Sequence, residues 1–121
     1  MKGERILIAD DDFVVRDGLQ RLIGLFGEKD GHEIVGIAGS VAEVEALVES
    51  GVRPTVALVD NKFPGYGDGE KAKNIIKKLS SDTIVISFSS NDGLTWGDEN
   101  WPKLMPAKEL VQKLTELEHK K

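Results

Sequence analysis

Two apolar runs of the chain end on acidic residues. Arg5–Ala9 is followed by Asp10–Asp12, and Val56–Val59 is followed by Asp60. Short, nearly continuous apolar runs are typical of parallel strands that are covered on both faces. If the two runs are neighbouring parallel strands, their carboxyl ends meet at one edge of the sheet and the acids lie together there. Because clustered carboxylates repel one another, this arrangement predicts a bound cation.

The kind of cation follows from the ligand types. The chain has no cysteine and its two histidines are far apart, so the candidate ligands are oxygen atoms. Oxygen ligands favour magnesium or calcium over zinc, and magnesium is usually held by a few carboxylates together with water and phosphate oxygens. We therefore expect Mg²⁺ at Asp10, Asp11 and Asp60.

Length and charge limit the classes of function. The 121 residues suffice for one domain, which we expect to span residues 1–121. The net charge of -5 and the lack of a long basic block argue against direct nucleic-acid binding, whose affinity comes mostly from neutralising phosphates. The first apolar run is too short for a signal peptide or a membrane span, so we expect a cytoplasmic protein that does not bind membranes.

Strand-like runs alternate with helical periodicity along the chain, which is the pattern of an α/β domain whose parallel sheet carries helices on both faces. Expected strands are Arg5–Ala9, Glu33–Ala38, Val56–Val59, Thr83–Phe88 and a short one near Trp101–Leu104. Expected helices are Phe13–Phe26, a helix between a capping box at Ser40 and a C-cap at Gly51, a helix from about Glu70 to Leu79, and a last one from Pro106 to about His119.

Two segments depart from regular structure. Residues Asn61 to Gly69 are rich in turn formers and predict a shaped loop after the third strand. Residues Asn91 to Pro102 show no helical stripe, so a fourth helix is expected to be shortened or absent before the fifth strand. The four lysines of the third helix are interpreted as a solvated face: Lys71, Lys73, Lys77 and Lys78.

Taken together, these residues resemble the receiver domain of bacterial two-component response regulators over essentially the whole chain. The opening Ile6 to Leu19 is most similar to receivers that precede a LuxR/NarL-type output domain, although no output domain is expected here. The features that carry the resemblance occur in order: Asp10 and Asp11, Asp60, Pro64, Asp68-Gly69, Ser89 and Lys103. The resemblance implies a single doubly wound, flavodoxin-like sheet of five parallel strands in the order 2-1-3-4-5.

The resemblance also implies a role for each matching residue. Asp60 would accept a phosphoryl group from a sensor histidine kinase or a phosphotransfer protein. Mg²⁺ would be held by Asp11, Asp60 and the main-chain carbonyl of Lys62, with Asp10 supporting it. Ser89 would donate its hydroxyl to the phosphoryl group and Lys103 its ammonium. The implied function is a stand-alone signalling domain, rather than an enzyme in its own right, which is a monomer or weak dimer and switches an unknown protein target.

The chain departs from the family pattern at several positions. Lys103 is followed by Leu104 instead of proline, and an alternative alignment places Met105-Pro106 at the Lys-Pro position, which would delete the lysine. Ser87 or Ser90 takes the place of Ser89 if the register of the fourth strand differs. The loop after Asp60 is one residue longer, Phe63 replaces the usual methionine, and either Asn100 or Trp101 occupies the position of the switching aromatic residue.

These departures support an alternative function. A degenerate receiver that binds a partner independently of phosphorylation would tolerate the altered loop, the Lys-Leu pair and the missing fourth helix. His32 and His119 are not expected to take part in phosphotransfer or metal binding. Trp101 is expected to pack in the core, while Trp96 fits either packing or an exposed contact.

Overall fold

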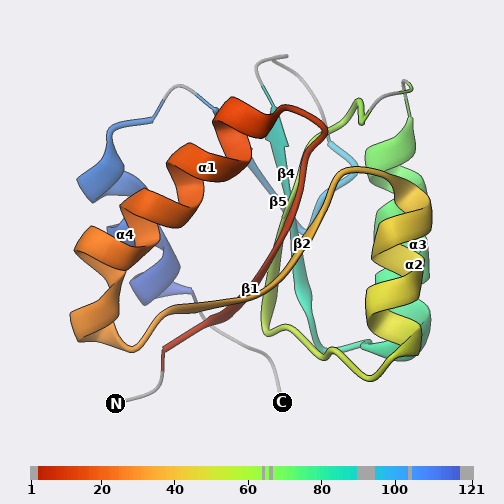
Figure 1. The fold of residues 1–121 in the computed structure, drawn as a ribbon, viewed down its shortest axis with the longest axis horizontal. Helices are drawn as coiled ribbons and strands as arrows, with labels where there is room; N and C mark the ends of the chain where they lie inside the picture. The colour runs from red at the N-terminus through yellow and green to blue at the C-terminus, as the bar shows by residue number, and fades with distance from the viewer. Residues whose placement is uncertain (1–2, 64, 66, 90–94, 104, 118–121) are drawn as a thin grey trace.

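The computed structural model describes residues 3–63, 65, 67–89, 95–103 and 105–117. Five parallel strands form one sheet in the order β2-β1-β3-β4-β5, as expected (Figure 1). The strands are β1 Arg5–Ala9, β2 Glu33–Ala38, β3 Val56–Val59, β4 Ile84–Ser89 and β5 Glu99–Pro102. The helices are α1 Phe13–Leu22, the π-helical η1 Ile23–Gly27, the 3₁₀-helical η2 Glu28–Asp30, α2 Val41–Glu49, α3 Asp68–Leu79 and α4 Ala107–Glu116.

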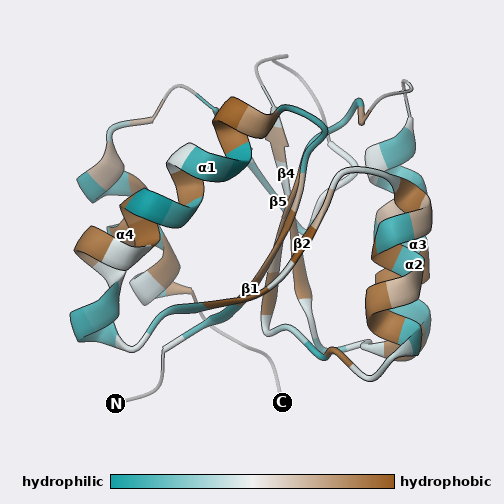
Figure 2. Ribbon diagram, viewed as in Figure 1, coloured by the Kyte–Doolittle hydropathy of each residue, from teal (hydrophilic) through white to brown (hydrophobic). Residues whose placement is uncertain are grey.

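Helices cover both faces of the sheet, with α1, η1 and α4 on one face and α2 and α3 on the other (Figure 1). The alternation of side chains along β1 shows why both layers form. Ile6 and Ile8 pack in one apolar cluster with residues of α1 and α4, whereas Leu7 and Ala9 pack in a second cluster with residues of α2 and α3. Figure 2 shows hydrophobic strands running between the two helix layers. Burial on both faces therefore explains the continuous apolar runs.

The register of the central strands determines where the acids lie. Ala9 of β1 pairs with Val59 of β3. The ladder then extends one residue further, because the Asp60 amide donates to the Ala9 carbonyl at 2.9 Å and the Asp10 amide donates to the Ala38 carbonyl at 3.0 Å. The first acid after each strand is thus held by main-chain hydrogen bonds at the carboxyl edge of the sheet.

Local signals explain the helix starts. The Asp12 carboxylate accepts a hydrogen bond from the Val14 amide at 2.9 Å and caps α1. Ser40 caps α2 by accepting from the Glu43 amide, while the Glu43 carboxylate accepts from the Gly39 amide. The capping box predicted at Ser40 is therefore confirmed. No helix in the described part of the chain is long and apolar enough to span a membrane.

Several element boundaries differ from the sequence-based expectation. The first helix changes to π-helical geometry at Ile23 instead of continuing as α-helix to Phe26. The third helix begins at Asp68, two residues before the expected Glu70, and the last ends at Glu116, while His119 lies outside the described residues. β5 begins at Glu99, earlier than the expected Trp101, because the strand pairs with β4 from its first residue. Thr83, expected to begin β4, precedes it.

The connection between β4 and β5 is tied to α3 by Asp98. Its carboxylate accepts from the Val85 amide at 2.9 Å and lies 2.6 Å from the Lys77 ammonium and 3.5 Å from that of Lys73. The interpretation of these two lysines as part of a solvated face was therefore wrong. Residues 95–98 are not helical, which agrees with a shortened or absent fourth helix; the rest of the predicted helix position, residues 91–94, lies outside the described residues.

Asp98 gives a prediction for stability. Burial raises the pKa of its carboxyl, but hydrogen bonds from Lys77 and Val85 and the charges of Lys77 and Lys73 outweigh burial and hold the pKa below the ordinary value of 3.8. Its ionised form therefore stabilises the folded state above that value, and the stabilisation is lost as the pH falls through the lowered pKa.

We expect Asp98→Asn to lower the free energy of unfolding by about 1 kcal/mol at pH 7, because the amide keeps an acceptor for Val85 but loses the ion pairs. Urea unfolding at pH 7 and at pH 3 measures the effect, which should shrink at the lower pH. Asp82→Asn, at an exposed position between α3 and β4, is the control. Equal stability of the two variants at pH 7 would contradict the tie to α3.

Candidate functional site

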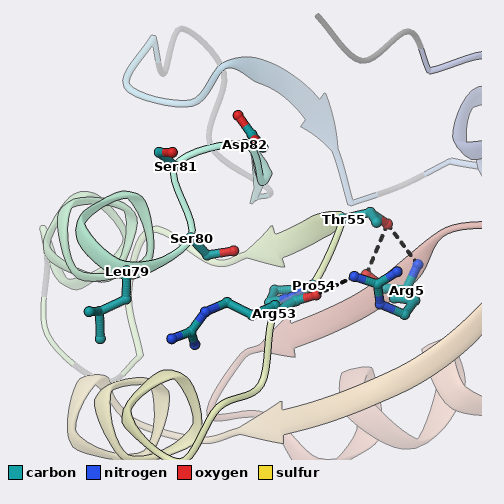
Figure 3. Close-up of a pocket in the computed structure, with 8 residues that line it drawn as sticks. All are labelled: Arg5, Arg53, Pro54, Thr55, Leu79, Ser80, Ser81 and Asp82. Carbon is teal, nitrogen blue, oxygen red and sulfur yellow. Dashed lines mark hydrogen bonds between the residues drawn. The ribbon is translucent and has the colours of Figure 1, made fainter. Parts of the chain in front are cut away.

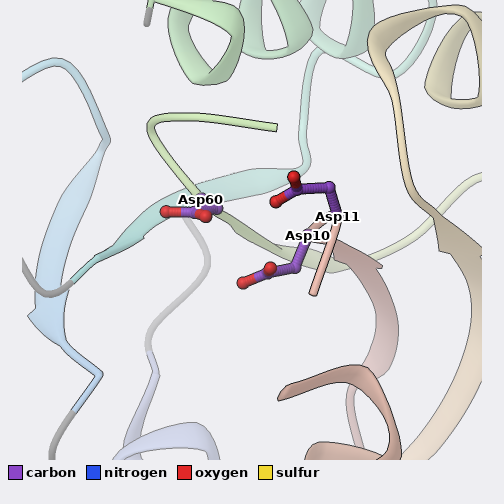
Figure 4. A group of neighbouring side chains, drawn as sticks. All are labelled: Asp10, Asp11 and Asp60. Carbon is purple, nitrogen blue, oxygen red and sulfur yellow. The ribbon is translucent and has the colours of Figure 1, made fainter. Parts of the chain in front are cut away.

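Three carboxylates meet where β1 and β3 end. Asp10 and Asp11 follow β1 and Asp60 follows β3, and Figure 4 shows the three side chains beside one another. One carboxylate oxygen from each lies within 4.8 Å of the others. Asp10 is buried, with 1% of its side chain exposed, and Asp11 is exposed. The structure thus brings together the three aspartates that the sequence singles out.

Lys103 lies between two of these carboxylates. Its Nζ is 2.6 Å from Asp10 Oδ2 and 3.1 Å from Asp60 Oδ2, and its side chain is 18% exposed. Lys103 directly follows β5, and its amide donates to the carbonyl of Ser89 at 3.2 Å. The lysine chosen from the sequence therefore lies at the acidic cluster even though Leu104 follows it. A single ammonium offsets part of the charge of both carboxylates.

The environment shifts two pKa values. Burial, followed by the charge of Asp10, raises the pKa of Asp60 above 3.8, although the charge and hydrogen bond of Lys103 oppose this. Burial lowers the pKa of Lys103, but its contacts with Asp10 and Asp60 outweigh burial and raise the pKa above 10.5. Lys103 is therefore charged at neutral pH, while ionisation of Asp60 carries a cost for the folded state.

The donor set fits Mg²⁺. It consists of carboxylate oxygens on a partly exposed edge, which suits a cation that retains several waters. Asp10 Oδ1 accepts from the Asp12 amide at 2.9 Å. Asp10 Oδ2 is buried and receives no aligned hydrogen bond from the described residues. The charged group nearest to it is the Lys103 ammonium, 2.6 Å away. Lys62 is exposed, and the metal contact expected of its main-chain carbonyl stays a prediction.

The expected hydroxyl donor remains a prediction as well. Ser89 is the buried last residue of β4, next to Pro102 in β5. Ser87, the alternative in the same strand, donates its hydroxyl to Asn100 Oδ1 at 2.5 Å. Ser90, the other alternative, lies outside the described residues. The structure gives the positions of Ser89, Lys103 and Asp60, while their roles in phosphoryl chemistry stay predictions.

The loop after Asp60 contains a contact that sequence reasoning missed. The indole N–H of Trp96 donates to Asn61 Oδ1 at 3.1 Å, and the Lys73 ammonium donates to the Trp96 carbonyl at 2.7 Å. The two residues of the first contact are 35 apart in the chain, so no local pattern predicts it. By contrast, Trp101 is buried against the other face of the sheet, as expected, and its indole N–H donates to Glu99.

His32 has a structural role. The ring is buried; its Nδ1 accepts from the Glu4 amide at 2.9 Å, and its Nε2 lies 3.0 Å from the hydroxyl of Thr115 on α4.

A separate hollow of about 350 Å³ lies at the opposite edge of the sheet, beside Arg5 and Arg53 (Figure 3). Each of these arginines donates to a main-chain carbonyl. Neither feature adds a residue to the carboxylate cluster.

Replacing the bridging lysine tests the electrostatic balance of the site. Lys103→Ala leaves the buried Asp10 without its counter-charge, so we expect the free energy of unfolding in EDTA to fall by about 2 kcal/mol. Added Mg²⁺ should restore much of that loss because a cation takes over the neutralisation. Thermal unfolding with and without Mg²⁺ measures both effects. Lys108→Ala, at an exposed position of α4, is the control. A Lys103→Ala variant as stable as this control would contradict the role of Lys103 as the counter-charge of Asp10.

The raised pKa of Asp60 predicts a pH dependence. Ionising Asp60 costs the folded state, so its destabilising effect is present at neutral pH and disappears as the pH falls below the ordinary value of 3.8. Asp60→Asn should therefore stabilise the metal-free protein at pH 7 and leave it nearly unchanged at pH 3. Chemical unfolding at both pH values measures the change in the free energy of unfolding. A gain in stability that is as large at pH 3 as at pH 7 would contradict the raised pKa of Asp60.

Proteins of known role match this sequence, although no family model does. The transcriptional activator DevR/DosR of Mycobacterium tuberculosis is 34% identical over 92 residues, which cover 74% of this chain and 41% of that protein. The response regulator GacA of Pseudomonas protegens is 34% identical over 81 residues, covering 67% of this chain and 36% of that protein. The chain therefore spans about two fifths of the length of these relatives.

Solved structures agree with the sequence matches. The receiver domain of a response regulator NarL from Mycobacterium tuberculosis superposes with a TM-score of 0.76 at 24% identity and covers 94% of both chains. A LuxR-family response regulator from Aurantimonas sp. also gives a TM-score of 0.76, covering 92% of this chain and 81% of that one. Since the sequence relatives are response regulators and the fold is that of a receiver domain, the chain belongs to the response-regulator receiver domains.

Proposed function

We propose that Asp60 accepts a phosphoryl group, in the presence of Mg²⁺, from a phosphohistidine of a sensor histidine kinase or phosphotransfer protein. The observation that carries this proposal is the position of Lys103 between Asp10 and Asp60, with Asp11 beside them at the carboxyl edge of the sheet. The arrangement combines a carboxylate nucleophile, a fixed positive charge and an oxygen-ligand set for a divalent cation. These are the parts that phosphoryl transfer requires.

The transfer is a displacement at phosphorus. A carboxylate oxygen of Asp60 forms a bond to phosphorus while the bond to the imidazole nitrogen breaks, and the nitrogen keeps the electron pair. Lys103 lies where it can pair with a phosphoryl oxygen instead of with Asp60. Asp10 and Asp11, with Asp60, would hold Mg²⁺, which when bound supplies neutralisation of the negative charges that repel each other during attack.

The nucleophile must be ionised in order to attack. Burial raises the pKa of Asp60, so the site needs positive charge to keep the carboxylate reactive. Lys103 supplies part of that charge in the absence of metal. Ser89, at the end of β4, is proposed as a hydroxyl donor to the phosphoryl group. The acyl phosphate formed on Asp60 can in turn be hydrolysed at the same site, so the domain controls its own phosphorylated state.

Surface features support a protein partner. Phe13 and Val14 begin α1 immediately after the acids and are 68% and 74% exposed. Exposed apolar side chains next to a reaction centre favour docking of the protein that delivers the phosphoryl group. We further propose that the domain works in the cytoplasm, with regulated protein contact as its output. The net charge of -5 favours a protein target over direct nucleic-acid contact.

Intact-mass measurement with a small-molecule phosphodonor tests the function. We expect one phosphoryl addition that requires Mg²⁺ and disappears in Asp60→Asn, because Asp60 is the nucleophile. Asp11→Asn should slow the addition at limiting Mg²⁺ by about tenfold, since the amide keeps an oxygen but loses the charge that attracts Mg²⁺, and the loss of even an outer-shell partner has an effect of that size. Asp12→Asn, which keeps a capping side chain outside the proposed ligand set, is the matched control.

Two results would decide against phosphorylation at Asp60. One is an addition that persists in Asp60→Asn. The other is a native protein that takes no phosphoryl group from the donor although it binds Mg²⁺. The second result would favour a degenerate receiver that contacts its partner independently of phosphorylation.

A further inference from the structure

The loop that follows Asp60 is held by a side chain from a distant segment. Trp96 lies between β4 and β5, and its indole N–H donates to the Oδ1 of Asn61, the residue next to Asp60. The Asn61 carbonyl accepts in turn from the Gly69 amide at 3.1 Å. One side chain thus contacts the segment that connects the nucleophile to the expected carbonyl ligand of Lys62.

Gly69 shows how closely these groups are packed. A Cβ atom at this position would lie 2.5 Å from the Asp60 carbonyl and even closer to the Trp96 ring. The start of α3, the Asp60 main chain and the indole therefore meet without room for a methyl group. The indole both covers the start of α3 and donates to the loop, so its position restricts the position of the Asp60–Asn61 backbone.

Trp96 is itself anchored. Lys73 of α3 donates to the Trp96 carbonyl at 2.7 Å. Two residues later, the Asp98 carboxylate binds Lys77 of α3 and the amide of Val85 in β4. The segment that carries the indole is therefore tied to α3 and to the sheet. A donor whose main chain is held at Trp96 itself and at Asp98 can hold its acceptor in place more strongly than a freely rotating side chain would.

We propose that Trp96 is a positioning residue of the phosphoacceptor site, which through Asn61 holds the loop after Asp60 in the geometry that binds Mg²⁺ and receives the phosphoryl group. This inference rests on the proposed function and assigns part of the site to the connection between β4 and β5. The same contact links occupancy of the site to that connection, because a shift of Asn61 must move Trp96 or break the hydrogen bond.

Replacement of each tryptophan by phenylalanine gives a matched pair of variants. Trp96→Phe keeps a ring over Gly69 but removes the donor to Asn61. Trp101→Phe makes the same chemical change on the other face of the sheet, where the lost donor is bonded to Glu99. Both proteins lose one indole N–H, and only one loses contact with the Asp60 loop.

Three measurements separate positioning from general stability. In EDTA, hydrogen exchange at the Gly69 amide should be several-fold faster in Trp96→Phe than in Trp101→Phe at equal pH, since the Asn61 carbonyl that accepts it is less restrained. Amide shifts of residues 60–62 during a Mg²⁺ titration should give a dissociation constant about tenfold higher in Trp96→Phe than in Trp101→Phe. A factor of about ten is the lower end of the range for loss of a group that orients a metal ligand. The phosphorylation rate at limiting Mg²⁺ should fall by a similar factor.

Restoring a donor provides the final control. Trp96→His offers a ring N–H on a shorter side chain and should recover part of the Mg²⁺ affinity if the hydrogen bond positions the loop. Trp96→Phe and Trp101→Phe with equal Gly69 exchange and equal Mg²⁺ affinity would overturn the inference. If the native protein binds Mg²⁺ but takes no phosphoryl group, the proposed function fails while the exchange and Mg²⁺ measurements still decide the role of Trp96. A native protein that binds no Mg²⁺ overturns both.

Discussion

Repulsion among carboxylates at the end of a parallel sheet is the constraint around which this domain is built. The strands must be apolar on both faces to support two helix layers, so polar chemistry is confined to the residues just beyond them. Main-chain hydrogen bonds place Asp10 and Asp60 side by side at that point, and the ammonium of Lys103 lies between their oxygens. The last strand therefore has to end close enough to deliver that charge, which couples β5 to the two central strands.

The sequence predicts the parts of the fold in which one local pattern determines the structure. Continuous apolar strands, the Asp12 and Ser40 caps and the acids after β1 and β3 all follow from neighbouring residues. The start of β5 does not, because Glu99 and Asn100 are exposed polar residues in an edge strand and only pairing with β4 shows where it begins. Lys103 is found by its distance from the last helix, a feature of the family that periodicity alone does not provide.

The lysines of α3 show a second limit of sequence reasoning. On a helical wheel Lys73 and Lys77 lie on a polar face, which is normally solvated. Their partners are the Trp96 carbonyl and the Asp98 carboxylate, which belong to a connection without helical periodicity. Local patterns reveal that such side chains are polar but not which distant segment they bind. The same holds for the Trp96–Asn61 contact, so the sequence predicts where the acids lie but not which distant side chain contacts the loop beside them.

Lys103 also has a consequence for how the domain is maintained in a cell. Some small metal-binding domains unfold when the ion is withdrawn, because ion binding supplies much of their folding free energy. Here the ammonium of Lys103 already lies among the acids, so we expect the domain to fold without the ion. If Asp60 is phosphorylated in the presence of Mg²⁺ as proposed, a shortage of the ion should stop phosphorylation while the protein stays folded, so the response could resume without new synthesis when the ion returns.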